Sequence, residues 1–497
     1  MSTVLSRAPA GLEAPLVRVE VHLGSGLPAF FIVGLPEAVV RESRERVRSA
    51  LVTSGFAFPT GRITVNLSPA DLPKEGGRFD LPIAVGILAA SGQVPRCALQ
   101  QREFYGELSL SGELRETPKL LPALVTGSRA GNELILPAAN ALEASLVDCP
   151  QLKLAGHLLQ VCDALEGRAA LATTRPQPQV MPKQWPDLAE VRGQFGAKRA
   201  LEIAAAGEHA LLMIGPPGAG KMLLAQRLPG LLPPLTKSEA LDVAILESAA
   251  GRRPSSGGCR PFRNPQHTAT VAALISSGGL MPGELSLAHL GVLFLDELPE
   301  FARTALEALR EPLESGVVLL SRVKRTCEFP ARFQLLAAMN PCPCGYAGDP
   351  GGRCRCTAEQ VTRYRNRLSG PLIDRIDIHV ELSAVPVDHL LADAPQPVET
   401  SAAVAARVVA ARDSQMNRQG KLNSRLAPTE VARICRLGAD SRALLGTAIA
   451  RLGLSTRAYH RVLKLARTCA DLAGEPHIRK VDVSEAVKLR ALDRLIC

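Results

Sequence analysis

The sequence predicts an α/β protein with two successive α/β domains and a helical C-terminal domain. Three observations predict this fold class. From Val17 to about Leu165, short β-branched runs are mixed with helical stretches. From about Leu188, fully apolar strands are followed by helices, the pattern of a parallel sheet covered on both faces. Beyond about Val385 the chain is almost entirely helical and rich in Ala, Leu and Arg.

Length, composition and charge restrict the class of protein. The chain has 497 residues, too many for a single core, and its 46% hydrophobic and 21% charged residues are typical of a folded globular protein. A net charge of +10 and a pI near 9.1 favour a nucleic-acid partner, although basic proteins without one are common. With 3% aromatic residues and a single tryptophan, stacking platforms for single-stranded bases cannot be widespread.

Long apolar runs would indicate a membrane span or a signal peptide. No apolar run is long enough to cross a bilayer, and the opening stretch MSTVLSRAPAGLEAP lacks the apolar core of a signal peptide. We therefore expect a cytoplasmic protein without a membrane partner, in which the 12 cysteines stay reduced.

The elements of the first domain are indicated by local patterns. The runs LVRVEVHL, RITVNLS and NELILP predict strands, and EAVVRESRERVRSALVTSG predicts a helix. The following stretch is rich in Pro, Gln and Thr and has no apolar periodicity, as in a linker. The expected segments are a first domain at 1–165, a linker at 166–187, a second domain at 188–384 with a cysteine-rich insertion at 341–357, and a helical domain at 385–497.

The stretch GPPGAGKM differs by one residue from the phosphate-binding pattern G-x-x-x-x-G-K-[ST]. A strand at Ala210–Ile214 precedes it and a helix is expected over Leu223–Leu228, so that backbone N–H groups face the phosphates. Lys221 would reach the β- and γ-phosphates, but Met222 replaces the hydroxyl that holds Mg²⁺. The expected ATP-binding residues are Gly215, Pro216, Pro217, Gly218, Ala219, Gly220, Lys221, Met222 and Asp296.

Two further apolar strands end in polar side chains. Val292–Leu295 runs into Asp296, which would hold Mg²⁺, and Glu297, which would polarise the attacking water. A capping role explains one such acid, but explains the pair less well. The strand Phe333–Met339 ends at Asn340, which could orient the same water. Three strand ends of this kind predict a working site for ATP and Mg²⁺.

Longer motifs resemble a known family. The stretches LPKEGGRFDLPIAVGILAASG, PFRNPQHTATVAALI, PGELSLAHLGVLFLDELPEFARTALEALREPLESG, QLLAAMNPCPCGYAGDP and SGPLIDRIDIHVEL closely resemble the YifB/ComM family of magnesium-chelatase-like AAA+ ATPases, over nearly the whole chain. The resemblance implies an N-terminal domain similar to the Lon proteolytic domain, an AAA+ P-loop domain and a C-terminal helical lid. It also implies a cytoplasmic, ring-shaped, hexameric ATP-driven DNA helicase; ComM members promote branch migration of incoming DNA during natural transformation.

The same resemblance assigns roles to two arginines. Arg375, in the stretch DRID, matches the arginine finger that reaches the γ-phosphate held by a neighbouring subunit. Arg457, in LSTRAYHRVLKLAR, matches the sensor arginine of the lid. Without the resemblance, both would be interpreted as surface or helix-dipole arginines. The expected catalytic residues are thus Glu297, Asn340, Arg375 and Arg457.

Residues 316–329 alternate on both sides of VKR, which predicts a β-hairpin with a basic tip formed by Arg322, Lys324 and Arg325. In related ring helicases a hairpin at this position points into the central pore and binds the phosphate backbone. We therefore expect binding to single-stranded or branched DNA without sequence preference. A solvated basic turn is the alternative.

Four cysteines gather on a Gly- and Pro-rich loop as two C-x-C pairs: Cys342, Cys344, Cys354 and Cys356. Four thiolates on a short loop suggest a structural zinc ion. The spacing is tighter than the usual C-x2-C, and free thiols or a redox-formed disulfide are equally compatible with it.

The residues of a Lon-type protease are not found in the first domain. When Pro73 and Gly76 are aligned with the Lon motif P-x-D-G-P-S, the serine falls on Arg78. The proteolytic lysine falls on Leu121, with Lys119 nearby but out of register. Without nucleophile and base the domain cannot perform acyl transfer, so we expect a docking or DNA-contacting platform.

Two other functions are compatible with a P-loop domain. One is the ATPase subunit of a metal chelatase that acts on tetrapyrroles; the Lon-like domain and the lack of a D-x-S-x-S motif in the sequence argue against it. The other is a nucleotide-dependent scaffold without turnover, which Met222 keeps open.

Overall fold

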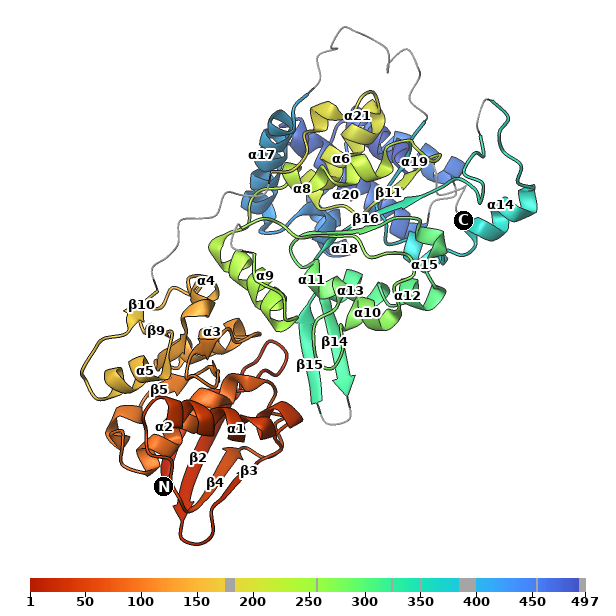
Figure 1. Ribbon diagram of the computed structural model, residues 1–497. Helices are drawn as coiled ribbons and strands as arrows, with labels where there is room; N and C mark the ends of the chain where they lie inside the picture. Colours follow the sequence, from red (N-terminus) through yellow and green to blue (C-terminus); the bar gives the residue numbers. More distant parts are fainter. Residues whose placement is uncertain are drawn as a thin grey trace. The chain divides into compact units, whose positions relative to one another are not determined.

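The computed structural model of the chain describes residues 1–174, 184–255, 258–322, 325–348, 351–383, 399–452 and 455–490 (Figure 1). The chain divides into two compact units, each described separately below. Unit 1 comprises Met1–Pro182, Lys237–Gly258 and Leu280–Pro282; unit 2 comprises Lys183–Thr236, Cys259–Gly279 and Gly283–Cys497. Among the described residues, no helix is long and apolar enough to cross a membrane.

Unit 1 is built on a mixed eight-stranded sheet in the order β10-β9-β8-β5-β1-β2-β4-β3. Strands β1 and β2 pair antiparallel, as do β2 and β4, whereas β1, β5, β8 and β9 run parallel. The three strands predicted from sequence in this unit are confirmed as β2, β4 and β8. The strands are β1 Ser2–Arg7, β2 Leu16–Gly24, β3 Ala29–Val33, β4 Arg62–Ser68, β5 Arg102–Phe104, β8 Glu133–Pro137, β9 Leu152–Ala155 and β10 Ala172–Thr173.

The helices of unit 1 pack on this sheet. The predicted helix is confirmed as α1, Ala38–Thr53, and it packs beside α2, Asp80–Ala90, which also contacts β1 and β2. Residues 80–89 of α2 are all buried, because the helix lies between the sheet and its neighbours. The remaining elements are α3 Leu121–Arg129, α4 Ala141–Ala144, α5 Leu158–Leu165 and a small hairpin of β6 Glu107–Leu108 and β7 Leu114–Arg115.

Helix α9, Lys237–Ala249, belongs to unit 1, although it lies within the segment 188–384 expected for the second domain. Its residues Leu241, Ala244 and Ile245 contact the apolar cluster around α3. Their spacing of three and four residues places them on one helix face. The Ser248 hydroxyl accepts a hydrogen bond from the Leu121 N–H at 3.2 Å. An apolar stripe and a polar contact therefore fix this helix on α3.

In unit 1, Arg78, which aligns with the Lon serine, bonds to the backbone shortly before Leu121, which aligns with the Lon lysine. The buried Arg78 guanidinium donates hydrogen bonds to the carbonyl oxygens of Pro118, at 2.6 Å, and Lys119, at 3.3 Å, three and two residues before the fully buried Leu121. Burial lowers the pKa of Arg78 to about 10. Neither side chain offers a nucleophile or a general base.

Unit 2 contains a five-stranded parallel sheet in the order β12-β13-β16-β11-β17, which confirms the predicted parallel sheet. Alternate residues of the strands enter two separate cores: Leu211 faces one and Leu212 the other. Such burial on both faces explains the uninterrupted apolar runs. The strands are β11 Leu211–Ile214, β12 Phe262–Arg263, β13 Val292–Leu295, β16 Gln334–Met339 and β17 Ile378–Glu381.

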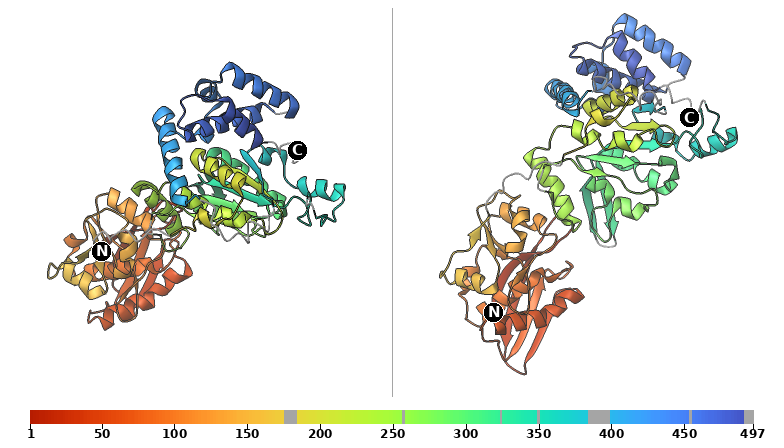
Figure 2. Two further views of the ribbon diagram at one scale, coloured as in Figure 1. Left: turned by 90° about the horizontal axis from the view of Figure 1, so that it is seen from above. Right: turned by 45° about the horizontal axis from the view of Figure 1, so that its top comes forward.

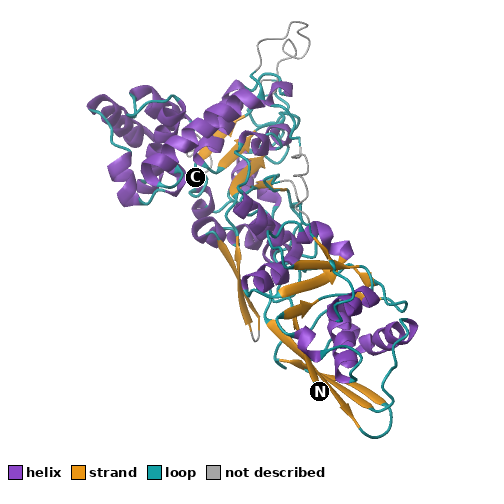
Figure 3. Ribbon diagram, turned by 90° about the vertical axis from the view of Figure 1, so that its left-hand side faces the viewer, coloured by secondary structure: helices purple, strands orange, loops and turns teal. Residues whose placement is uncertain are grey.

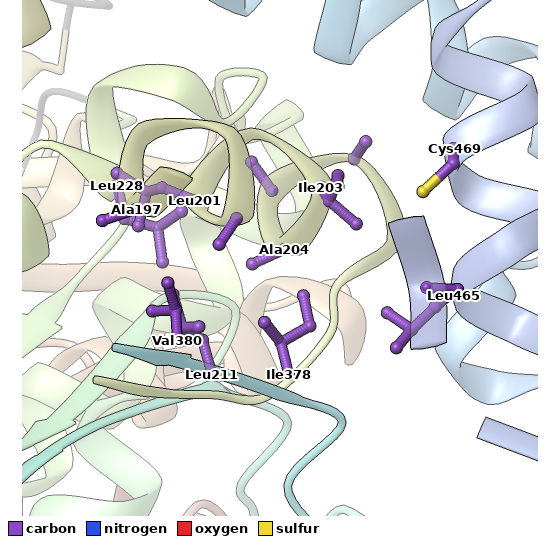
Figure 4. Close-up of a cluster of buried hydrophobic side chains, with 14 of the residues drawn as sticks. Ala197, Leu201, Ile203, Ala204, Leu211, Leu228, Ile378, Val380, Leu465 and Cys469 are labelled. Carbon is purple, nitrogen blue, oxygen red and sulfur yellow. The ribbon is translucent and has the colours of Figure 1, made fainter. Parts of the chain in front are cut away.

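Helices cover this sheet on both faces (Figure 3). Helix α6, Phe195–Gly207, packs over β11 and β17, and Figure 4 shows Leu201 and Ala204 above Leu211 and Ile378. The helix expected over Leu223–Leu228 is interrupted: α7, Lys221–Ala225, ends before α8, Leu228–Leu231. The break has a cause in Pro229, which has no N–H to donate to a preceding turn. The others are α10 Val271–Ile275, α11 Glu284–Leu287, α12 Arg303–Glu307, α13 Arg310–Ser315, α14 Ala358–Arg365 and α15 Gly370–Ile373.

The C-terminal helices form a group within unit 2, as predicted (blue in Figure 2). Helix α20 packs against α21, α17 and α6, and its Leu465 and Cys469 point toward α6 in Figure 4. The predicted hairpin is also confirmed: β14, Val317–Arg322, pairs antiparallel with β15, Arg325–Pro330. The C-terminal helices are α17 Ser401–Gln419, α18 Pro428–Ile434, α19 Ala439–Leu452, α20 Thr456–Leu472 and α21 Lys480–Lys488.

Candidate nucleotide-binding site

Three neighbouring strands of unit 2 end at the same edge of the sheet. In the parallel register, Ile214 at the end of β11 pairs with Met339, and Leu295 at the end of β13 pairs with Ala337. The residues that follow these strands are Gly215, Asp296 and Asn340. The structure therefore brings together the loop, the acid pair and the amide that the sequence analysis singled out.

The backbone of the loop after β11 depends on glycine. Gly218 and Gly220 have φ angles of 78° and 89°, in the left-handed region that other residues rarely adopt. Gly215 has no room for a side chain, because a Cβ there would lie 2.7 Å from the carbonyl oxygen of Leu382. Helix α7 begins at Lys221, immediately after Gly220. The glycine pattern is thus a requirement of the turn that leads from strand to helix.

The Lys221 ammonium lies inside this loop. It donates hydrogen bonds to the carbonyl oxygens of Gly215, at 2.6 Å, and Pro216, at 3.1 Å, and to the side-chain oxygen of Asn340, at 2.9 Å. Burial lowers the pKa of Lys221, against the opposing influence of Asp296 and Glu297. These two carboxylates are therefore close enough to act on the ammonium electrostatically.

The two acids differ in their surroundings. Asp296 is half-buried, and its Oδ1 accepts a hydrogen bond from the Glu297 N–H at 2.9 Å. Glu297 is exposed, has a left-handed φ of 53°, and lies 3.3 Å from Nδ1 of His267 through its Oε2. The sequence does not predict this contact, because His267 lies within the motif PFRNPQHTATVAALI at no spacing that marks a functional histidine. His267 is in a position to orient the Glu297 carboxylate.

Met222 follows Lys221 in α7 and is half-buried. Its side chain packs against the apolar cluster that contains Leu201, Leu211 and Leu224. The thioether is thus accommodated by the core beneath the loop.

Arg375 and Arg457 lie elsewhere in unit 2, where both line one cavity of about 860 Å³. Arg375 donates to the Pro371 carbonyl oxygen at 2.7 Å and forms an ion pair with Glu314. Basic side chains outnumber acidic ones in the lining, which also includes Lys421, Arg425, Arg461 and Lys464 beside Glu208, Glu314 and Asp377.

The cavity and the P-loop lie at opposite edges of the sheet. The cavity is lined by Ala210, directly before β11, and by Asp377, directly before β17, whereas the P-loop follows the last residue of β11. A strand of four residues spans about 13 Å. The structure therefore does not bring Arg375 and Arg457 to the P-loop of their own chain.

The predicted DNA contacts can be placed only in part. Arg322 and Arg325 are backbone partners at the tip end of the β14–β15 hairpin. Their side chains, and Lys324 altogether, lie outside the described residues.

The four clustered cysteines converge in space. Their sulfur atoms all lie within 4.8 Å of one another, with 3.4 Å between Cys342 and Cys344, 3.8 Å between Cys342 and Cys354, and 3.7 Å between Cys344 and Cys354. A tetrahedral zinc ion with bonds of about 2.3 Å requires its sulfur ligands to be about 3.8 Å apart. The four residues, completed by Cys356, fit such an ion.

The cysteine loop also contacts the P-loop. A Cβ on Gly345, which has a φ of 86°, would lie 2.6 Å from Cδ of Pro217, so the two loops pack backbone against ring. Cys342 is fully buried and follows Asn340 by two residues. A change in the conformation of the cysteine loop would therefore alter the packing of Pro217 in the P-loop.

Comparisons with known proteins agree with this architecture. The family described as magnesium chelatase, subunit ChlI, matches residues 187–390; subunit ChlI of Mg-chelatase matches 19–140, and its C-terminal family matches 398–490. The chain is 48% identical to the uncharacterized protein YifB of Salmonella typhimurium, with 100% of this chain and 98% of the relative covered.

It is also 48% identical to the competence protein ComM of Haemophilus influenzae, with the same shares covered, and 40% identical to the uncharacterized protein Mb2921c of Mycobacterium bovis, over 99% and 98% of the two chains. Relatives of this similarity span the whole chain, including the first domain, the P-loop domain and the C-terminal helices. The chain therefore belongs to the YifB/ComM family of magnesium-chelatase-like proteins.

Proposed function

We propose that this protein is an ATP-driven, ring-forming DNA motor of the YifB/ComM type, which promotes branch migration of incoming DNA. One observation carries the proposal: Lys221, Asp296 and Asn340 lie at one edge of the sheet, and Arg375 and Arg457 line a basic cavity at the other. Each chain thus carries two different halves of an ATPase site. A ring of identical subunits joins the halves at every interface.

ATP binding is supported by the geometry of the first half. The backbone N–H groups from Gly218 to Lys221 are available to the phosphates, and the Lys221 side chain supplies a positive charge. Magnesium neutralises charge that develops during phosphoryl transfer, and the carboxylate placed to hold it is Asp296. Glu297 would polarise the attacking water while His267 orients its carboxylate, and Asn340 would position the same water.

Turnover in this chain is expected to be slower than in a subunit with a hydroxyl after the lysine. Met222 offers a soft thioether, which is a weak ligand for magnesium. Because its side chain packs into the core, a water molecule could take the place of the missing hydroxyl. The metal would then be held through Asp296 and the phosphates.

A ring assembly is supported by the distance between the halves. Arg375 and Arg457 line a cavity at the edge of the sheet opposite the P-loop of their own chain, so a second copy would present them, and the family resemblance favours six copies. In this arrangement the two arginines stabilise negative charge on the γ-phosphate held by the neighbour.

DNA as the partner is supported by the excess of basic residues, with a net charge of +10, and by the hairpin with a basic tip sequence. The relative from Haemophilus influenzae is named a competence protein, which favours a role with incoming DNA. A cytoplasmic location accords with this role. The N-terminal unit would serve as a docking or DNA-contacting platform.

A structural zinc ion on Cys342, Cys344, Cys354 and Cys356 completes the proposal. The ion would take no part in the reaction. It would fix the loop that lies against Pro217 and extends from Asn340.

The test is ATP turnover with and without forked DNA, followed by strand displacement on a branched DNA substrate. Stimulation by DNA together with ATP-dependent displacement is the expected result. An ATP turnover rate that is the same with and without DNA would favour a chelatase-type subunit. A complete lack of turnover would favour a nucleotide-dependent scaffold.

A further inference from the structure

We infer that Asp377 is a positioning residue that holds Arg375 and Arg457 together, so that both reach a neighbouring subunit's ATP as one rigid group. This inference rests on the proposed function, because it concerns the half of the site that is presented to another subunit. Asp377 acts on the two arginines through the elements that carry them.

The first element is the segment that carries Arg375. Asp377 follows Arg375 by two residues and is only 8% exposed. Its N–H donates to the Ala210 carbonyl oxygen at 3.0 Å, and its Oδ2 accepts from the Ala210 N–H at 3.3 Å. The Arg490 guanidinium donates to the carbonyl oxygens of Ile376, at 2.9 Å, and Asp377, at 3.1 Å. The segment from Arg375 to Asp377, called the finger segment below, is therefore bonded to Ala210 directly before β11 and to Arg490, two residues after α21.

The second element is helix α20, which carries Arg457. Oδ1 of Asp377 accepts a hydrogen bond from Arg461, which lies one turn after Arg457 on the same face of the helix. Oδ2 of Asp377 lies 3.2 Å from Nδ1 of His209, whose Nε2 lies 2.8 Å from the Thr468 hydroxyl two turns further along α20. One carboxylate thus fixes α20 at two points, directly and through His209.

The charge of Asp377 is maintained by these contacts. Burial alone would raise the pKa of this carboxyl, but Arg461, His209 and Lys464 together hold the pKa well below its ordinary value. The carboxylate is therefore ionised whenever the motor works. Replacing it with a neutral amide would remove the charge that pairs with Arg461 and loosen α20 from the finger segment.

Two kinetic effects are expected for Asp377→Asn. Turnover should fall by about a hundredfold, the loss that a displacement of catalytic groups by about 1 Å produces. The nucleotide affinity of the separate subunit should stay at the wild-type value, because the P-loop lies at the other end of β11. Asp374→Asn, which removes a half-buried carboxylate from the same segment, is the matched control and should keep wild-type turnover.

The decisive experiment mixes two inactive full-length variants and measures ATP turnover. Lys221→Ala subunits lack a working P-loop but keep Asp377, and Asp377→Asn subunits keep the P-loop. In rings formed from an equal mixture, about a quarter of the interfaces join an intact P-loop to a neighbour with both Arg375 and Asp377 intact, because every interface takes its two halves from different subunits. Turnover should therefore return to about a quarter of the wild-type value. A mixture of Lys221→Ala with Arg375→Ala is the reference for the finger itself.

The outcomes separate the inference from the proposed function. Recovery with Arg375→Ala but not with Asp377→Asn would overturn the role of Asp377. Failure of both mixtures would overturn the shared site, and the inference with it. If thermal melting shows that Asp377→Asn does not fold, Arg461→Ala is used instead, because it breaks the same ion pair from the other side. Its mixture with Lys221→Ala should recover turnover to the same extent. A lack of recovery in that mixture, while the mixture with Arg375→Ala recovers, would equally overturn the inference.

Discussion

The Lys221 ammonium and the Asn340 side-chain oxygen are 2.9 Å apart, although 119 residues separate them in the sequence. The contact is possible because Ile214 and Met339, which end the two strands concerned, are register partners in the parallel sheet. The residue that would bind phosphate and the residue that would position water are thus assembled by strand pairing alone. Their roles can be separated by mutation.

Asn340→Ala should lower turnover by about a hundredfold while ATP affinity changes little, because a misplacement of the attacking water by about 1 Å produces a loss of this size. Lys221 keeps the carbonyl oxygens of Gly215 and Pro216 as partners in this variant. Steady-state turnover and titration with a fluorescent ATP analogue provide the two readouts. Lys221→Ala is the comparison and should lose nucleotide affinity itself. An Asn340→Ala protein with equal losses in both readouts would show that the amide serves binding instead.

Nucleotide should drive ring formation, because ATP at one edge of the sheet recruits the basic cavity of a second copy. Sedimentation with a non-hydrolysable ATP analogue should shift the protein to a species of about six subunits, as the family resemblance implies. Arg375→Ala should weaken this shift and abolish turnover. A protein that stays monomeric with every nucleotide would refute the shared site.

The sequence predicts the parts of this molecule better than their assembly. The apolar runs before Gly215, Asp296 and Asn340 are strands because burial on both faces leaves a clear local signal. Helix α9 gives no such signal of its partner: its stripe of Leu241, Ala244 and Ile245 would fit any apolar surface, and it packs with unit 1.

The sequence also does not predict contacts between side chains that are far apart along the chain. Nothing in the local sequence distinguishes His267 from other loop histidines, but the fold places its Nδ1 3.3 Å from Oε2 of Glu297. Arg375 and Arg457 were identified separately by resemblance, and only the fold reveals that they share one cavity at the edge opposite the P-loop. The convergence of the two C-x-C pairs likewise depends on how their loop closes against Pro217.

Zinc should be present at about one equivalent per chain when the protein is purified without chelator, because four thiolates at this spacing bind the ion tightly. Cys354→Ser should reduce the zinc content and also weaken ATP binding, since the cysteine loop packs on Pro217. Elemental analysis and nucleotide titration measure the two effects. Cys97→Ser, at an exposed cysteine of unit 1, is the control. Less than about half an equivalent of zinc in the wild-type protein would favour free thiols.

The pair Lys324→Ala and Arg325→Ala should weaken binding to all DNA sequences alike and reduce its salt dependence. Each lost phosphate contact lowers the log–log salt slope by about 0.9 on duplex DNA or about 0.7 on single strands. Binding curves at several salt concentrations, on two unrelated sequences, measure both properties. An unchanged slope would exclude the hairpin from the DNA path.

Met222→Thr should raise turnover by about tenfold, which corresponds to about 1.4 kcal/mol of activation free energy. The new hydroxyl would give magnesium a hard oxygen ligand, and the metal acts mainly on charge that develops in the transition state, so turnover should gain more than ATP affinity. The gain has a cost in stability, because Met222 packs against the core around Leu201 and Leu224 and threonine leaves part of that volume unfilled. Met222→Leu, which keeps an apolar side chain of similar volume, is the control and should leave turnover and its magnesium dependence at the wild-type values. If the threonine variant also leaves both unchanged, another group already supplies what the hydroxyl would, and the departure from the P-loop pattern at this position has no catalytic consequence.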